Sequence, residues 1–129
     1  MGSRHISEVM GMKMIVAIVR PEKYEEVKDA LKAKGVTGMT FTHVTGRGMQ
    51  AGVKFTTRVG EFTVDEIEKV KFEIVIEDDS DVQCVVDTIC SAASTGRHGD
   101  GRIFVLPVES AVRISEWEPA PGAEEEKEQ

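Results

Sequence analysis

The chain has 129 residues, which is room for one domain, and 30% of them are charged. Its formal net charge of −7 argues against nucleic acid as the main partner, because phosphate backbones bind basic proteins. No apolar run is long enough to span a bilayer. The two cysteines, Cys84 and Cys90, diverge on a predicted helix, so we expect buried thiols in a reducing cytoplasm rather than a disulfide or a metal site.

The two ends are set apart from the predicted domain, residues 12–115. Residues 1–11 are expected to be a leader, natural or introduced by cloning, with the natural start at Met10 or Met12. Residues 116–129 contain six acidic residues and one lysine, together with two prolines and a glycine. Such a segment is expected to be solvated and disordered, and without it the domain is close to neutral.

The first predicted strand is Lys13–Arg20, a short apolar run that ends at Pro21. A continuous apolar run of this kind is typical of a central strand buried on both faces. Pro21 then opens a helix with early glutamates and late lysines, which suits the helix dipole. Gly35 is expected to end this helix, and a threonine-rich strand follows at Met39–Thr45.

Neither helical nor strand periodicity holds from Gly46 to about Glu66, where glycine recurs at 46, 48, 52 and 60. About twenty structureless residues inside a compact domain generally indicate function or disorder. The opening of the segment places glycine amides beside Arg47, which suits a phosphate or a carboxylate. A mobile surface loop explains the same pattern as well.

Apolar alternation resumes at Val70–Ile76, which predicts a strand. Ser80 or Asp81 is expected to cap a second helix, whose apolar side chains recur at helical spacing from Val82 to Ala93. The remaining predicted segments are a glycine loop at Thr95–Gly101, a strand at Arg102–Pro107 and an extended piece at Val108–Ile114.

The predicted order of elements indicates an α+β, ferredoxin-like βαββαβ fold, with a four-stranded antiparallel sheet and two helices on one face. One short domain has no third layer to cover the opposite face of the sheet. We therefore expect oligomerisation to cover it.

The second glycine loop also contains the cations Arg97 and Arg102. Gly96 as the helix C′ residue and a tight turn at residues 99–101 would explain it structurally. Two glycine-rich, arginine-bearing loops in one small domain are equally consistent with an anion site. The acidic run at residues 77–81 lacks the glycine and the closing glutamate of a calcium loop. None of the three histidines (His5, His43 and His98) has metal-ligand spacing.

A longer pattern begins at Thr95, where the sequence reads T-x-x-x-G-D-G-R-I-F-V-x-x-V. With Arg20-Pro21, Gly38-Met39-Thr40 and G-x-G-x-Q-x-G from Gly46, it resembles the nitrogen regulatory P-II family over about a hundred residues. The resemblance implies a non-catalytic homotrimer in the cytoplasm that binds ATP or ADP in clefts between subunits. It also identifies residues 46–66 as the T-loop, which docks on a target protein.

The resemblance assigns ligand contacts residue by residue. The implied nucleotide-binding residues are Thr40, Gly46, Arg47, Gly48, Val75, Gly99, Asp100, Gly101, Arg102 and Arg113. The implied 2-oxoglutarate-binding residues are Arg20, Gln50, Ala51, Gly52 and Lys69. Gln50 would also hold a Mg²⁺ ion that bridges ATP and 2-oxoglutarate. Cationic side chains and glycine amides are suitable partners for phosphates and a dicarboxylate.

The chain departs from the family pattern at four positions. Met49 and Ser115 stand where basic residues are usual, which should weaken ATP more than ADP or AMP. Phe62 and Gly60 stand where some members carry a uridylylated tyrosine or a phosphorylated serine. Regulation is therefore expected to depend on ligands alone.

Three functions are weighed. The first is a nitrogen sensor whose target is an ammonium transporter, glutamine synthetase or nitrogenase. The alternative is a P-II-like sensor of carbon status that binds ADP, AMP or bicarbonate and is linked to a bicarbonate transporter. An acylphosphatase-type enzyme shares the fold, but it needs an asparagine that orients water, and the chain contains none.

Overall fold

The computed structural model describes residues 11–47, 53–58, 60–64 and 66–122. The main sheet contains β1 (Lys13–Val19), β2 (Thr40–Gly46), β5 (Ile67–Ile76) and β6 (Gly101–Pro107), and the helices are α2 (Tyr24–Ala33) and α3 (Val82–Ala93). A separate pair of strands consists of β3 (Val53–Thr57) and β4 (Gly60–Val64). The predicted order of strands and helices in the main domain is confirmed.

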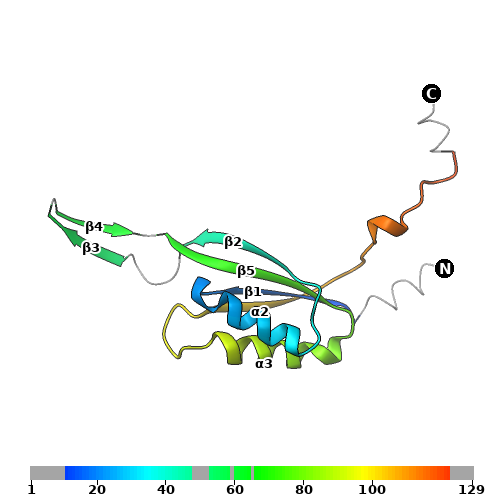
Figure 1. Ribbon diagram of the computed structural model, residues 1–129. Coiled ribbons are helices and arrows are strands. Elements are labelled where there is room, and N and C mark those ends of the chain that lie inside the picture. Colours follow the sequence, from blue (N-terminus) through cyan, green and yellow to red (C-terminus); the bar gives the residue numbers. More distant parts are fainter. Residues whose placement is uncertain (1–10, 48–52, 59, 65, 123–129) are drawn as a thin grey trace.

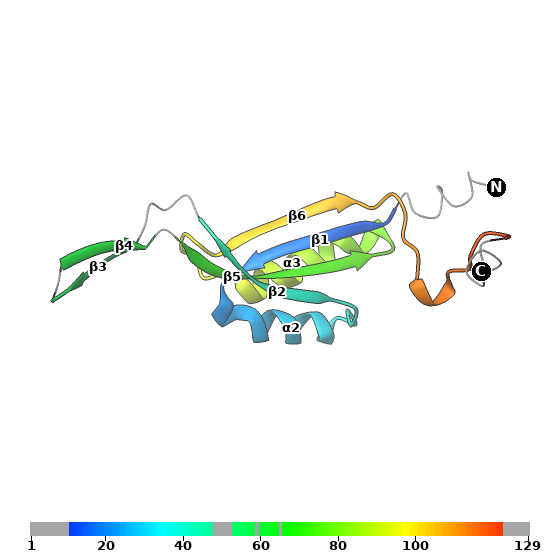
Figure 2. The ribbon, with the colours of Figure 1, turned by 90° about the horizontal axis from the view of Figure 1, so that it is seen from above.

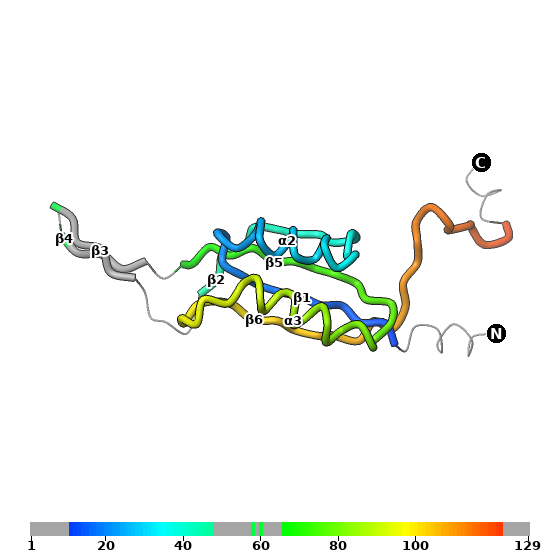
Figure 3. The backbone as a smooth tube through the Cα atoms, turned by 60° about the horizontal axis from the view of Figure 1, so that its bottom comes forward, coloured from blue at the N-terminus to red at the C-terminus, as the bar shows by residue number. Residues whose placement is uncertain are grey.

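The four strands of the main sheet lie in the order β2-β5-β1-β6, and all neighbours are antiparallel. Both helices lie on the same face of this sheet, with α2 and α3 side by side beneath it (Figures 1 and 3). This is the predicted ferredoxin-like arrangement. The strand that follows α3 therefore pairs with the first strand of the chain.

The core lies between the sheet and the two helices. In β5, alternate residues from Val70 to Ile76 are buried, as the sequence predicted. In β1, Ile15, Ala17 and Val19 are buried on the same side, and Val27, Leu31, Val85 and Ile89 meet them from the helices. Phe72 is fully buried and stacks with the Tyr24 ring at a centroid distance of 5.7 Å.

The other face of the sheet is open, so the expectation that β1 is buried on both faces is wrong for the single chain. Met14, Val16 and Ile18 alternate with the buried residues of β1 and are only half-buried. Their partners across the strand pairs include Phe104, Leu106 and Val75, which are 43%, 44% and 45% exposed. These six residues form an apolar patch, here called the open face (Figure 2 views the sheet from this side).

The first helix begins and ends as predicted. Pro21–Lys23 form a 3₁₀ turn that leads into α2. Gly35 has φ of +88°, and the amides of Gly35 and Val36 donate to the carbonyls of Lys32 and Leu31. This is the Schellman ending that glycine permits, because it has no Cβ to clash in the left-handed region.

Two expectations about the second helix are wrong, and a third is right in position only. Asp81 is the N-cap residue of α3, as predicted, but its side chain makes no capping hydrogen bond. The Asp78 carboxylate instead caps the preceding 3₁₀ turn at Asp79–Asp81, where it accepts from the Ser80 amide at 3.0 Å. Cys84 and Cys90 are exposed rather than buried, since neither lies on the helix face that meets the sheet. Gly96 is not the C′ residue, because α3 ends in an extended cap one residue after Ala93 and Gly96 lies two residues beyond that cap.

The middle segment contains regular structure where a structureless loop was expected. β3 and β4 pair antiparallel from Val53↔Val64 to Thr57↔Gly60. This hairpin projects beyond one end of the main sheet (Figure 1). The two strands do alternate, since the apolar pairs Val53↔Val64 and Phe55↔Phe62 are separated by Lys54↔Thr63, but each run is only five residues long and the period was missed. β5 also begins at Ile67, earlier than predicted, where it pairs with Gly46.

The chain after β6 runs away from the opposite end of the sheet (Figures 1 and 2). It is anchored where the Val108 amide donates to the Met12 carbonyl at 3.1 Å. The expected extended piece is irregular and leads into a 3₁₀ turn at Ile114–Glu116. The predicted leader up to residue 10 and the last part of the predicted tail, residues 123–129, lie outside the described residues. Within the described ranges, no helix is long and apolar enough to cross a membrane.

Substitutions at a buried and at an exposed isoleucine test where the core lies. Ile89 is fully buried and Ile114 is 93% exposed. We expect Ile89→Ala to lower the free energy of unfolding by about 2–5 kcal/mol, because it leaves a cavity in the core. Ile114→Ala should change it by less than about 0.5 kcal/mol. Urea unfolding followed by circular dichroism at one fixed protein concentration measures both, and equal losses would contradict this core.

Candidate functional site

Most of the predicted ligand residues meet at one end of the main sheet. β1 and β2 end there, at Val19 and Gly46, and the antiparallel strands β5 and β6 begin there. Arg20 and Lys69 are therefore brought to the loop of residues 95–101, whereas Gly46 and Arg47 lie at the same end on the opposite edge strand, β2. The β3–β4 hairpin leaves the sheet at the same end (Figure 1), so this end is here called the hairpin end.

The loop of residues 95–101 is held in shape by Asp100. The carboxylate of Asp100 accepts from the Thr95 amide at 2.8 Å, from the Gly96 amide at 3.0 Å and from the Thr95 hydroxyl. The Arg97 amide in turn donates to the Thr95 hydroxyl oxygen at 3.2 Å. The hydrogen bonds from Thr95 hold the pKa of the Asp100 carboxyl well below its usual range, so the group is an anion at neutral pH.

Two cations from elsewhere in the chain are attached to this loop. The Arg20 guanidinium donates through Nε to Asp100 at 3.0 Å and through Nη2 to the His98 carbonyl at 2.7 Å. The Lys69 ammonium donates to the Gly99 carbonyl. Burial lowers the pKa of Lys69, and the nearby Arg20 lowers it further, since two cations repel each other. An anion placed between Arg20 and Lys69 would relieve this repulsion.

Two glycines are required by close approaches within this loop. Gly101 has φ of +116°, and a Cβ there would lie 1.8 Å from the Ile18 carbonyl oxygen. Gly99 has φ of +94°, and a Cβ there would lie 3.3 Å from Nη2 of Arg20. No side chain fits at Gly101 without separating β1 from β6. The glycines of the signature therefore let the backbone lie against a neighbouring strand and a cation.

The hairpin end is suited to an anionic ligand. Its cations are Arg20, Arg47, Lys69, Arg97 and Arg102. Among the described residues gathered with them, Asp100 is bonded within the loop, and Glu22 is near enough to Lys69 to raise the pKa of that group against the larger effects of burial and Arg20. Guanidinium groups and backbone amides are the usual partners of phosphates and carboxylates.

The structure does not bring every predicted residue to this end. Thr40 and Val75 lie toward the opposite end of the sheet, and Arg113 lies in the segment beyond β6. Lys69 and Val75 are six residues apart on one strand, which corresponds to about 20 Å. Gly48, Gln50, Ala51 and Gly52, and the departure Met49, lie outside the described residues.

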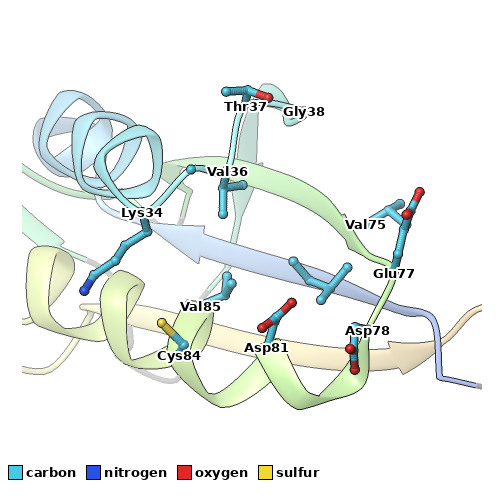
Figure 4. A pocket seen from close by; sticks show the side chains of 12 residues that line it. Lys34, Val36, Thr37, Gly38, Val75, Glu77, Asp78, Asp81, Cys84 and Val85 are labelled. Atoms are coloured by element: carbon cyan, nitrogen blue, oxygen red, sulfur yellow. The ribbon is translucent and has the colours of Figure 1, made fainter.

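The hollows of the single chain are open. One of about 280 Å³ at the hairpin end is lined partly by Asp100, Gly101 and Arg102. A larger one of about 650 Å³ lies at the opposite end, where Figure 4 shows the acidic side chains of Glu77, Asp78 and Asp81 with Lys34 and Cys84. The smaller hollow falls just below the usual size of ligand pockets, and the carboxylates of the larger one repel phosphate.

Sequence reasoning missed two members of the site. Thr95 was read only as part of a signature, yet its amide and hydroxyl both bind Asp100. The carbonyl of His98 holds Arg20, although the histidine side chain suggested no role. The spacing of a threonine five residues before an aspartate is a local signal for such a closed loop. Among the described residues, no group of three His, Cys, Asp or Glu side chains could hold a metal ion.

Comparisons with known proteins agree with this geometry. A family model described as "Nitrogen regulatory protein P-II" matches residues 12–118. The chain is 52% identical over 103 residues to "Nitrogen regulatory protein P-II 2" of Methanothermobacter thermautotrophicus, which covers 80% of this chain and 89% of that protein. It is 46% identical over 104 residues to "Nitrogen regulatory protein GlnK2" of Haloferax mediterranei, covering 81% and 84%. It is 50% identical over 103 residues to "Nitrogen regulatory protein P-II" of Microchaete diplosiphon, covering 80% and 91%.

The fold is ferredoxin-like, with cations and glycines gathered at one end, and the family model that matches it is that of small signalling proteins. The chain belongs to the nitrogen regulatory protein P-II family, as the resemblance predicted. Its role is therefore signalling in nitrogen regulation, and proteins of this family are signalling proteins rather than enzymes. Members of the family bind adenine nucleotides and 2-oxoglutarate and act on target proteins.

Substitutions at two glycines of the loop distinguish the stability cost of backbone strain from that of steric contact. Gly96 and Gly101 both have positive φ, but a Cβ at Gly96 meets nothing within 4 Å. Gly96→Ala should cost about 1–2 kcal/mol of unfolding free energy for the left-handed conformation alone. Gly101→Ala should cost about 1–3 kcal/mol more, because the strand pair must move apart. Thermal and urea unfolding measure both, and equal costs would show that the contact with Ile18 is not close.

Proposed function

We propose that this chain is a homotrimeric sensor that binds an adenine nucleotide and 2-oxoglutarate between subunits and regulates a nitrogen-metabolism target through residues 46–66. The observation that carries the proposal is the convergence at the hairpin end. There Arg20 and Lys69 lie against the glycine loop, and Arg102 begins the adjacent strand. A phosphate chain and a dicarboxylate both need such a set of cations and amides.

The distribution of the ligand residues supports a site made from two subunits. Val75 lies about 20 Å and Thr40 about 13 Å along the strands from Lys69, so neither reaches the same small ligand group within one chain. By strand alternation, Thr40, Val75, Lys69 and Arg102 all lie on the open face of the sheet. A second copy seated against the open face would bring its own residues to the hairpin end.

The trimer is tested by a charge on the open face. Phe104→Asp should convert a particle of three 14.2 kDa chains into monomers, because a buried unpaired carboxylate is costly. Ser91→Asp is the matched control, since Ser91 is exposed on α3 on the helix side of the sheet. Sedimentation velocity measures both. A wild-type monomer, or a Phe104→Asp trimer, would contradict an interface on the open face.

The ligands have separate roles in this proposal. The glycine loop with Arg102 and Arg113 binds the nucleotide phosphates, and Arg20 and Lys69 bind the carboxylates of 2-oxoglutarate. Mg²⁺, held through Gln50, bridges ATP and 2-oxoglutarate. Because Met49 and Ser115 are not basic, the triphosphate gains fewer cationic partners than in relatives that are basic at these positions, which favours ADP relative to ATP.

The target is reached through residues 46–66, whose hairpin projects from the ligand end of the sheet (Figure 1). Phe62 and Gly60 have no hydroxyl group, so ligands rather than covalent modification at these positions regulate docking. The targets are an ammonium transporter, glutamine synthetase or nitrogenase. The protein then acts in the cytoplasm and is recruited to a membrane when its target is a transporter.

A second function is favoured by one observation. The missing basic residues at Met49 and Ser115 suit a P-II-like sensor of carbon status that binds ADP, AMP or bicarbonate beside a bicarbonate transporter. Gln50 and Lys69 favour the nitrogen sensor instead, because these side chains match 2-oxoglutarate and its metal ion. The two functions differ in whether 2-oxoglutarate binds.

Isothermal titration calorimetry with ATP, ADP and AMP, each with and without 2-oxoglutarate and Mg²⁺, decides between them. We expect nucleotide binding, and measurable 2-oxoglutarate binding only with Mg²⁺ and ATP. Lys69→Gln should abolish 2-oxoglutarate binding while nucleotide binding stays measurable. Lys32→Gln, on exposed helix α2, is the control. Tight ADP or AMP binding without any 2-oxoglutarate response would support the carbon sensor, and no nucleotide binding would refute both.

A further inference from the structure

The Asp100 carboxylate accepts as many hydrogen bonds from its own chain as its lone pairs allow. It accepts from the Thr95 amide, the Thr95 hydroxyl, the Gly96 amide and Arg20 Nε. An ionised carboxylate offers about four lone-pair positions, so these four donors fill them. Its negative charge also repels phosphate. Asp100 is therefore poorly suited to be a direct contact for a nucleotide phosphate, although it lies at the centre of the loop.

Arg20 joins this loop to a distant part of the chain. It follows β1, 80 residues before Asp100, and its side chain is only 19% exposed. One guanidinium reaches both the Asp100 carboxylate and the His98 carbonyl, so it fixes two points of the loop at once. Gly99 lets the loop approach, since a Cβ there would be 3.3 Å from Nη2 of Arg20.

Lys69 makes the same kind of contact from β5. Its ammonium donates to the Gly99 carbonyl, next to the two points held by Arg20. Three successive residues, 98–100, thus hold the two cations that the proposed function assigns to 2-oxoglutarate. The loop that would bind phosphates and the cations that would bind the dicarboxylate form one bonded unit.

We propose that Asp100 is a positioning residue, and that its ion pair with Arg20 couples the shape of the phosphate loop to the cation pair of Arg20 and Lys69. This inference rests on the proposed function and concerns the regulation of the same site. The guanidinium of Arg20 and the ammonium of Lys69 each have further N–H donors, so a dicarboxylate can bind them while their bonds to the loop stay in place and keep the loop in the shape that binds phosphates. Arg20 therefore influences nucleotide affinity without contacting the nucleotide.

The test is a double-mutant cycle on ADP affinity, measured by calorimetry without 2-oxoglutarate. Asp100→Asn keeps the shape of the side chain but removes its charge, and Arg20→Gln removes the cation. Each should weaken ADP about tenfold, and the double variant should also be weakened about tenfold rather than about a hundredfold, because both remove one coupled interaction. Arg20→Lys should remain weakened, since one ammonium cannot make both the bond to Asp100 and the bond to the His98 carbonyl.

The matched control is Asp87→Asn. Asp87 accepts from Gln83 at 2.8 Å within α3, and its replacement removes one carboxylate outside the loop. Its ADP affinity should equal that of the wild type. The proposal is overturned if the double variant weakens ADP binding by the product of the two single effects. It is also overturned if Arg20→Gln leaves the ADP affinity unchanged.

Hydrogen exchange separates failure of this inference from failure of the proposed function. In Asp100→Asn and in Arg20→Gln, the amides of Thr95 and Gly96 should exchange at least about tenfold faster, while those of β1 and β5 stay protected. If the wild type binds no nucleotide, the proposed function fails and this readout alone decides the positioning role. Unchanged exchange of both amides in Arg20→Gln would then refute it.

Discussion

The close pairing of β1 with β6 at Val19 and Gly101 is the constraint on which the hairpin end depends. Only a residue without a Cβ can occupy position 101, because a Cβ there would lie 1.8 Å from the Ile18 carbonyl oxygen. That contact fixes where the loop of residues 95–101 enters the sheet. It thereby places Asp100 beside Arg20, which directly follows β1. The positions of the cations follow from strand pairing and not from local sequence.

Much of the fold could be predicted because its signals are local. The alternation from Val70 to Ile76 and the glycine after α2 both predict what the structure contains. The β3–β4 hairpin was missed because its two strands are only five residues long each and lie among recurring glycines, so the short alternation did not stand out. The exposure of Cys84 and Cys90 was also misjudged, because the spacing of two cysteines on a helix does not say which face of that helix packs against the sheet.

The site was predictable as a set of residues and not as a network. The glycine signature and its cations suggested anion binding before any geometry was known. The role of Asp100 could not be found from the signature, since its partner Arg20 is 80 residues away and reaches it only through the pairing of β1 and β6. The resemblance assigns Asp100 to the ligand residues, and the structure adds that its carboxylate accepts four hydrogen bonds from Thr95, Gly96 and Arg20.

Assembly and ligand binding depend on the same side of the main sheet. A single sheet with helices on one side leaves Val16, Phe104 and their neighbours uncovered, and the same side carries the predicted ligand residues. Burying this apolar surface against another copy would remove water from the charged residues at its edge. Coulombic attraction between those cations and an anion strengthens as water is excluded. Assembly would therefore do more than cover the open face, since it would also exclude water around Arg20 and Lys69 at its edge.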